Sequence, residues 1–174
     1  LTGKMGLVRN LTAGEIAGQV RVLAGALGLR DKAFNIVLMG MGEPLHNYDA
    51  VMKAMRILCD ERGFHLPPRR VTLSTVGLLP ALEKLGQEEL MPNLAISLHA
   101  PTDALRSQLV PVNQKWPVAE LLDAAAAYVR ATGRRISFEY VLMDGVNDTP
   151  AFAAVLGDLL HARLAGLAAD DGDV

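Results

Sequence analysis

Two patterns of hydrophobic residues alternate along the chain and predict alternating strands and helices. Short, mainly apolar runs are typical of buried strands, and apolar residues spaced three or four positions apart are typical of amphipathic helices. The runs predict strands over residues 34–40, 69–75, 93–99 and 135–143. The spaced residues predict helices that begin near residues 12, 47, 78, 103, 117 and 149, the one near 103 having only one or two turns. The chain therefore starts with a helix, after which strands and helices alternate.

Residues at several predicted helix ends support these boundaries. Thr12 and Glu15 fit a capping box, in which each side chain accepts a hydrogen bond from the backbone of the other residue. Asn47 is a candidate cap for the second long helix. Pro117 suits the first turn of a helix, and Gly133 lies just beyond the end of the same helix.

The order of the predicted elements indicates an α/β fold with a mainly parallel sheet. Because the run 34–40 is apolar without alternation, we expect a strand that is buried on both faces. Two architectures fit this order: an open doubly wound sheet, or part of a (βα) barrel. In both, ligands bind at the C-terminal ends of the strands.

Small and polar residues gather where the predicted strands end. Since the C-terminal ends of parallel strands meet at one edge of a sheet, we expect these residues to line a site for a ligand with many polar atoms. They are Gly40, Gly42 and Glu43 after the first strand, Ser74 and Thr75 at the second, Ser97 and His99 with Leu98 between them at the third, and Glu139 with the segment 144–148 at the fourth.

The residue types in this set suggest which groups they can bind. Gly40 and Gly42 suit a backbone that approaches a ligand closely or takes a positive φ. The Glu43 carboxylate can accept charge-assisted hydrogen bonds from an ammonium group, or it can cap the helix that follows a tight turn. The hydroxyls of Ser74 and Ser97 both donate and accept, which suits a carboxylate or a ribose.

Other motifs favour packing over chemistry. The spacing Gly40-x-Gly42 follows a strand, but Leu45 stands where a dinucleotide fingerprint has its third glycine. Cys59 lies among apolar residues of a helix and is expected to fill the core. The spacing of the four histidines fits no metal site. Four methionines are likewise expected to pack: Met39, Met41, Met52 and Met55.

Composition and charge limit the classes of protein that remain. The net charge of −2 argues against nucleic-acid binding through bulk positive charge. Arg69–Arg70 and Arg134–Arg135 are candidates for local phosphate contacts, but solvated charges in loops or at strand ends are the favoured alternative. The single Cys59 excludes an intrachain disulfide and indicates a reducing compartment. No secretory signal is visible, and no apolar run approaches the roughly 20 residues that span a bilayer. We therefore expect a cytoplasmic protein, and the start at Leu1 suggests a piece of a longer one.

Five motifs resemble those of the dual-specificity RNA methyltransferases of the RlmN/Cfr family, which are radical S-adenosylmethionine (SAM) enzymes. The resemblance extends from Gly3 to Asp148, with every motif in the family's order. It implies a partial (βα) barrel of radical SAM type, truncated at both ends. The motifs are GLVRNLTAGEI, VLMGMGEPLHNYDAV, RRVTLSTVGL, LAISLHAPTDALRSQLVPVN and FEYVLMDGVND.

The resemblance also implies a role for each matching residue. Gly42 and Glu43 would hold the amino group of SAM, and Ser74, Ser97, Leu98 and His99 would make further contacts with SAM. The three cysteines that hold a [4Fe-4S] cluster in this family would lie upstream of Leu1, and a methyl-carrying cysteine would lie downstream of the chain. Residues 1–174 would thus be a fragment of one radical SAM core domain, inactive when isolated.

The parent enzyme implied by the resemblance methylates C2 of adenosine in 23S rRNA and in tRNA, or C8 in the Cfr branch. Its partners would be these RNAs and an electron donor such as flavodoxin. The resemblance implies no association with a membrane. No residue of the chain separates the C2 branch from the C8 branch. The alternative from another class is a non-catalytic α/β module that binds SAM or a nucleotide through residues 40–43.

Overall fold

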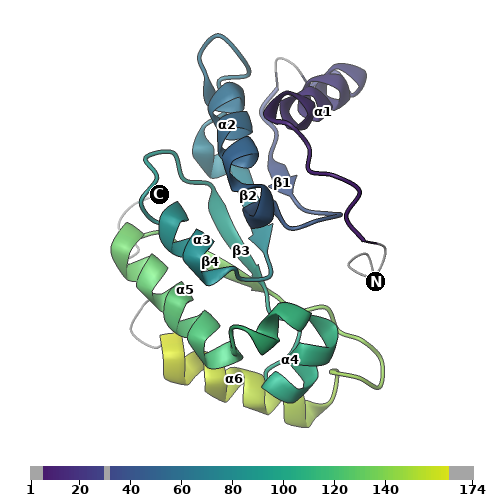
Figure 1. Ribbon diagram of the computed structural model, residues 1–174, viewed down its shortest axis with the longest axis vertical. Coiled ribbons are helices and arrows are strands. Elements are labelled where there is room, and N and C mark those ends of the chain that lie inside the picture. The colour runs from purple at the N-terminus through teal and green to yellow at the C-terminus, as the bar shows by residue number, and fades with distance from the viewer. Residues whose placement is uncertain (1–5, 30–31, 165–174) are drawn as a thin grey trace. The chain divides into compact units, whose positions relative to one another are not determined.

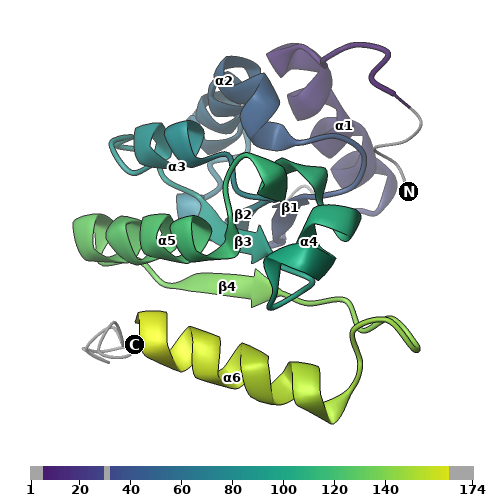
Figure 2. The same ribbon diagram turned by 60° about the horizontal axis from the view of Figure 1, so that its bottom comes forward.

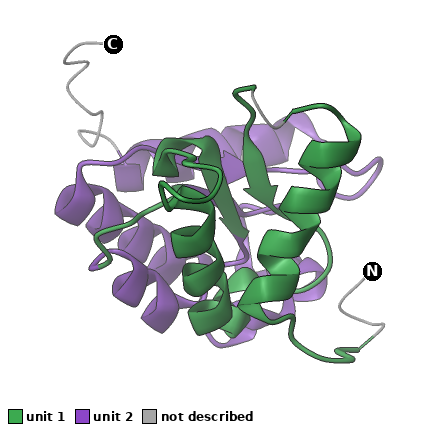
Figure 3. Ribbon diagram, turned by 90° about the horizontal axis from the view of Figure 1, so that it is seen from above, with its two compact units in different colours: residues 1–74, 88–93 green, residues 75–87, 94–174 purple. Residues whose placement is uncertain are grey.

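The computed structural model describes residues 6–29 and 32–164, in which helices alternate with parallel strands (Figure 1). These residues divide into two compact units (Figure 3). Unit 1 comprises residues 1–74 and 88–93, and unit 2 comprises residues 75–87 and 94–174. Among the described residues, no helix is both long enough and apolar enough to cross a bilayer.

Unit 1 contains two helices and a parallel pair of strands. The α-helices are α1 (Ala13–Ala26) and α2 (Tyr48–Cys59), which pack against each other. The strands are β1 (Ile36–Leu38) and β2 (Val71–Thr75), the last residue of which begins unit 2, and they pair in parallel with Ile36 opposite Val71. Short 3-10 helices, η2 (Pro44–Asn47) and η3 (Pro68–Arg70), precede α2 and β2.

Unit 2 contains the second parallel pair and four helices. Strand β3 (Asn93–Ser97), of which Asn93 belongs to unit 1, pairs in parallel with β4 (Ile136–Glu139), so that Ser97 lies opposite Glu139. The α-helices are α3 (Leu79–Leu85), α4 (Asp103–Leu109), α5 (Val118–Thr132) and α6 (Pro150–Leu164). A 3-10 helix, η4 (Pro111–Gln114), follows α4. Helices α5 and α6 contact each other, and strand β4 is drawn between them in the view of Figure 2.

Each unit has apolar side chains packed behind its strands. In unit 1, Ala17 and Leu58 form a cluster with Leu66, and Ile36 of β1 packs against it. In unit 2, Leu94 and Ile96 of β3 are at most 2 % exposed. The alternating order and the parallel pairing confirm the predicted α/β fold class.

The predicted capping box at α1 is confirmed. The Glu15 backbone donates to Thr12 Oγ1 over 3.2 Å, and the Thr12 backbone donates to Glu15 Oε2 over 2.8 Å. Arg9 adds a bidentate contact to the same carboxylate, at 2.8 and 2.6 Å. The cap therefore ties the segment before α1 to its first turn.

The prediction for residues 34–40 is wrong in two respects. The strand covers only Ile36–Leu38, and its middle residue Val37 is 50 % exposed. Successive side chains of a strand point to opposite faces, and the packed cluster of unit 1 covers only the face that carries Ile36. A mainly apolar run without alternation therefore did not mean burial on both faces.

Asn47 precedes α2 as predicted, but its side chain does not cap that helix. Its Nδ2 instead donates to the carbonyl oxygen of Leu11 over 2.8 Å. Asn47 therefore fixes the segment before α1 to the start of α2.

The predicted strand 135–143 is shorter in the structure, where β4 ends at Glu139. Side chains accept hydrogen bonds from the backbone amides that a longer β4 would need for pairing with a neighbouring strand. The Val141 amide donates to Nδ1 of His99 over 3.2 Å, and the Met143 amide donates to Oδ1 of Asn147 over 2.7 Å. The chain turns away from the sheet as a result.

Candidate functional site

Two glycines with positive φ follow β1. The φ angles of Gly40 and Gly42 are 121° and 96°, in the region that L side chains rarely adopt. A Cβ added to either residue would meet no atom within 4 Å. Backbone conformation, and not crowding, therefore requires glycine here, and the space beside this turn is open.

Glu43 follows these glycines and caps η2. Its Oε1 accepts a hydrogen bond from the Leu45 amide over 3.0 Å, and Pro44 occupies the first turn, where no amide is needed. The capping role that was one of two alternatives is therefore present. A carboxylate offers about four acceptor sites, so this bond is compatible with a contact to an ammonium group.

The methionines near this turn are not core residues. Met39 and Met41 are 61 % and 81 % exposed, so the expectation that they pack is wrong for both. Met52 and Met55 of α2 are each 1 % exposed and confirm it. The glycine turn holds the first pair outside the cluster of unit 1, whereas the helical spacing of the second pair directs it inward.

The end of β2 is buried. Ser74, the last residue of the first segment of unit 1, is 8 % exposed. In unit 2, Thr75 Oγ1 accepts from the Gly77 amide over 3.1 Å. Gly77 has φ 96°, and a Cβ there would collide with the Leu121 side chain, so this turn has room only for glycine.

Ser97 and Leu98 are held to β4 at the end of β3. The Ser97 hydroxyl donates to Glu139 Oε2 over 3.0 Å. The Leu98 amide donates to the Glu139 carbonyl oxygen over 2.9 Å, and the Leu98 side chain is fully buried. Leu98 therefore acts mainly by packing and by fixing its neighbours, whereas Ser97 keeps a polar atom at the strand end.

His99 adopts a conformation that is unusual for a residue other than glycine. Its φ is 60°, in the left-handed region. Its Nδ1 accepts from the Val141 amide over 3.2 Å, and its carbonyl oxygen accepts from Asn147 Nδ2 over 2.8 Å. Burial of the half-buried ring lowers the pKa of His99; Glu139 acts to raise this pKa and the Arg106 charge acts to lower it.

Arg106 of α4 is a buried residue that the sequence analysis did not single out. It is 0 % exposed, and its guanidinium donates to the carbonyl oxygens of Leu98, Val76 and Ser97 at 3.1, 2.7 and 3.1 Å. A fourth bond, of 3.1 Å, goes to Asn113 Oδ1. Burial lowers the pKa of Arg106 to about 10, opposed by the charge of Asp103. Arg106 thus joins the chain after β2 to the end of β3.

Asn147 is the second residue that the sequence analysis did not assign. It lies in the predicted polar segment 144–148 and is 1 % exposed. Its side chain bonds His99, Val141 and Met143. Neither Arg106 nor Asn147 has a sequence signal of its own, because a polar residue in a helical turn or loop is usually solvated.

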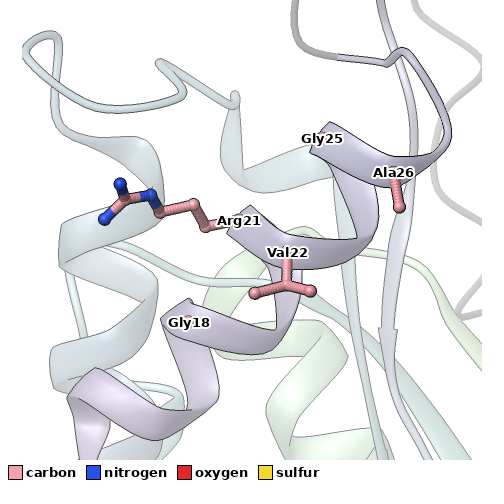
Figure 4. Close-up of a pocket in the computed structure, with 5 residues that line it drawn as sticks. All are labelled: Gly18, Arg21, Val22, Gly25 and Ala26. Atoms are coloured by element: carbon pink, nitrogen blue, oxygen red, sulfur yellow. The ribbon is translucent and has the colours of Figure 1, made fainter.

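The candidate residues are distributed over both units. Gly42, Glu43 and Ser74 belong to unit 1, and Ser97, Leu98 and His99 belong to unit 2. The structure brings the last three together with Glu139 and Arg106 through the bonds described above. The hollow in Figure 4 is lined by Gly18, Arg21, Val22, Gly25 and Ala26 of α1 and contains no candidate residue.

Comparison with known proteins gives consistent results. A protein from Symbiobacterium thermophilum named "Probable dual-specificity RNA methyltransferase RlmN" is 50% identical over 160 residues, which are 92% of this chain and 43% of the relative. A protein of the same name from Mycolicibacterium paratuberculosis is 52% identical over 172 residues, 95% of this chain and 47% of the relative. The chain spans about half the length of the curated relatives that it matches.

A solved structure and a family model agree with these relatives. The crystal structure of a radical SAM methyltransferase from Sphaerobacter thermophilus matches with a TM-score of 0.89 and 51% identity, over 93% of this chain and 48% of that one. This likeness confirms the expected α/β fold of radical SAM type. The sequence model of the radical SAM superfamily matches residues 3–153. The chain therefore belongs to the radical SAM superfamily.

Proposed function

We propose that the chain is the SAM-binding part of an RNA methyltransferase that methylates C2 of adenosine in 23S rRNA and in tRNA. The observation that carries the proposal is the turn after β1, where two glycines with positive φ and open space beside them precede the carboxylate-bearing Glu43. The names of the relatives support the reaction class and the RNA substrate. The motif resemblance supports the C2 position and the two RNA substrates.

The residues at the strand ends fit SAM. The Glu43 carboxylate would hold the ammonium group of SAM, since a charged acceptor and a charged donor form a strong hydrogen bond. Gly42 would allow the backbone to approach the cofactor. Ser74, Ser97 and His99 would bind its remaining polar groups, and Leu98 would hold the last two in place. SAM supplies the methyl group in this family, and these residues bind and orient it.

An iron–sulfur cluster does not fit the residues of this chain. Thiolates hold such clusters, and Cys59 is the only cysteine of the sequence. Burial raises the pKa of the Cys59 thiol and so disfavours its thiolate form. Within the described ranges, no three potential metal ligands gather. We therefore place the cluster cysteines in a part of the parent enzyme outside this chain and expect the isolated chain to be inactive.

The remaining partners follow from the same proposal. The parent enzyme would take electrons from a donor such as flavodoxin and would act on RNA in the cytoplasm.

A chimera tests the proposal. The chain would replace the matched segment of the Symbiobacterium thermophilum relative in cells that lack their own C2-adenosine methyltransferase. We expect 2-methyladenosine to return in 23S rRNA and tRNA, as measured by mass spectrometry of digested RNA. Glu43→Gln keeps an oxygen that can accept from the Leu45 amide but removes the charge. It should lower methylation by about 10- to 100-fold, the value of a lost charge-assisted hydrogen bond.

The matched control is Glu61→Gln, at an exposed position outside any strand end. This variant should methylate as well as the unmodified chimera. Full activity of Glu43→Gln would reduce Glu43 to a cap and remove the proposed contact with SAM. A folded but inactive unmodified chimera that still binds adenine nucleotides would favour the alternative of a non-catalytic nucleotide-binding module.

A further inference from the structure

The side chain of Asn147 makes three of the four hydrogen bonds that a side-chain amide can form. Its Nδ2 donates to the carbonyl oxygens of His99 and Val141, each over 2.8 Å. Its Oδ1 accepts from the Met143 amide over 2.7 Å. Because Asn147 is 1 % exposed, these bonds are shielded from water and fix the loop after β4 against the residue that follows β3.

His99 lies at the centre of this arrangement. Its carbonyl oxygen is held by Asn147, and its backbone stays in the left-handed region at φ 60°. For a residue other than glycine such a conformation persists only when its surroundings hold it in place. The bond from Asn147 is one of the contacts that hold it.

The same loop determines where the imidazole proton lies. The Val141 amide can only donate, so Nδ1 of His99 must accept and cannot carry a proton. The ring is then neutral, with its proton on Nε2. Nε2 makes no hydrogen bond to any residue in the ranges 6–29 and 32–164. The chain thus presents an N–H donor at the end of β3.

The charged groups around the ring are compatible with a neutral imidazole. Burial and the Arg106 guanidinium both lower the pKa of His99, and only the Glu139 carboxylate acts to raise it. The Glu139 carboxylate is itself engaged by the Ser97 hydroxyl at 3.0 Å. Arg106 is held by backbone oxygens on the β3 side, including that of Leu98.

We propose that Asn147 is a positioning residue that holds His99 as its Nε2–H tautomer, so that the site offers one N–H donor to an acceptor atom of the cofactor. The cofactor part rests on the proposed function. A neutral N–H donor suits an oxygen or ring nitrogen of SAM and does not suit its ammonium or sulfonium groups. Asn147 acts through His99 and through the carbonyl of Val141, and it does not touch the cofactor itself.

Nitrogen NMR of the 174-residue chain labelled with 15N-histidine tests this directly. His99→Gln identifies the His99 signals among the four histidines. In the unsubstituted chain at neutral pH, Nδ1 should resonate as an unprotonated ring nitrogen and Nε2 as a protonated one. A protonated Nδ1, or an average over both tautomers, would overturn the proposal without need of any Asn147 variant.

Two variants separate positioning from general loop stability. Asn147→Asp keeps an oxygen for the Met143 amide but loses both donor bonds, and Asn147→Ala loses all of the side-chain bonds. We expect mixed His99 tautomers in both variants, and SAM affinity about three- to tenfold lower, as for a lost or misplaced hydrogen bond. The matched control is Asp158→Asn, at an exposed position of α6, which should change neither property. An unchanged His99 tautomer in Asn147→Ala would overturn the positioning role.

Addition of SAM separates this proposal from the proposed function. We expect SAM to shift the His99 Nε2 signal together with the amide signals of Gly42 and Glu43. Shifts at Gly42 and Glu43 without a shift at Nε2 would overturn the His99 contact and leave the proposed function standing. No shift anywhere at saturating SAM, with the tautomer as expected, would count against SAM binding by the chain and leave the role of Asn147 in place.

Discussion

The guanidinium of Arg106 donates to the side-chain oxygen of Asn113 over 3.1 Å, and this bond joins two clusters of polar groups in unit 2. On one side, Arg106 holds the carbonyl oxygens of Val76, Ser97 and Leu98. On the other side, Asn113 Nδ2 donates to Asp103 Oδ1 over 2.9 Å, and the same oxygen accepts from the Val118 amide at the start of α5. The position of the C-terminal end of β3 thus depends on helices α4 and α5.

Loss of the Arg106 side chain should therefore destabilise unit 2 strongly. Arg106→Ala removes the guanidinium bonds to three carbonyl oxygens, and we expect the free energy of unfolding to fall by about 3 kcal/mol or more. Arg106→Lys should recover only part of this loss, because a single ammonium cannot reproduce the planar fork of donors. Urea titration followed by the fluorescence of Trp116, the only tryptophan, would measure both.

Arg130→Ala is the matched control for that measurement. Arg130 is exposed on α5, and surface substitutions of this kind change stability by about 0.5 kcal/mol or less. An Arg106→Ala variant that unfolds at the same urea concentration as the control would contradict the structural role assigned to Arg106.

The role of Arg106 also illustrates which parts of this structure the sequence could predict. The capping box at Thr12 and the helical spacing of the apolar residues of α2 were predictable. Both depend on residues a few positions apart and on local backbone geometry. Arg106 and Asn147 instead bond to backbone atoms of distant segments, as in the 48-residue separation between Asn147 and His99. Such bonds follow from the path of the chain, which no local pattern specifies.

The two faces of β1 show a second limit. Apolar character predicted the strand but not the presence of a layer over each face, and Val37 remains half exposed. At the candidate site, the polar residue types at the strand ends were evident. The capping bond of Glu43 and the left-handed φ of His99 were not, because both depend on how the chain turns after each strand.

Glycine substitutions should separate conformational strain from helix propensity. Gly42→Ala adds a Cβ in open space but at φ 96°, so we expect a loss of about 1 kcal/mol from backbone strain alone. Gly14 also faces open space but lies within α1, so Gly14→Ala should stabilise the chain by about 0.5 to 1 kcal/mol. Thermal unfolding of both variants measures the difference. A stabilising Gly42→Ala would show that the turn can adopt a negative φ.

The carboxyl group of Glu15 should titrate far below its usual range. Hydrogen bonds from Arg9 first, and then from Thr12, lower its pKa from 4.5 to about 2. Because the folded pKa lies below the unfolded one, the contribution of this cap to stability is present above about pH 4.5 and is lost as the pH falls toward 2. Carbon NMR of the side-chain carboxyl should give this pKa directly.

Arg9→Ala is the decisive variant for the same carboxyl. Removal of the Arg9 hydrogen bonds, which lower the pKa of Glu15 most, should raise this pKa toward its ordinary value, while the bonds from Thr12 keep it somewhat low. A pKa of Glu15 that stays the same in Arg9→Ala would mean that Arg9 points into solvent and that Thr12 alone stabilises the carboxylate.

The pH dependence of stability should reveal the environment of His99. Burial and the Arg106 charge lower the pKa of His99, against the opposing effect of Glu139, so the folded state favours the neutral ring that accepts from the Val141 amide. In the unfolded chain, the pKa of a histidine is about 6.5. The stabilisation is therefore fully present above that pH and is lost as the pH falls from about 6.5 toward the lower folded value.

We expect His99→Gln to flatten this part of the stability curve, measured by urea titrations between pH 5 and 8, relative to a His46→Gln control at an exposed position. Equal slopes in the unsubstituted chain and in His99→Gln would mean that the His99 ring is not held neutral by its surroundings.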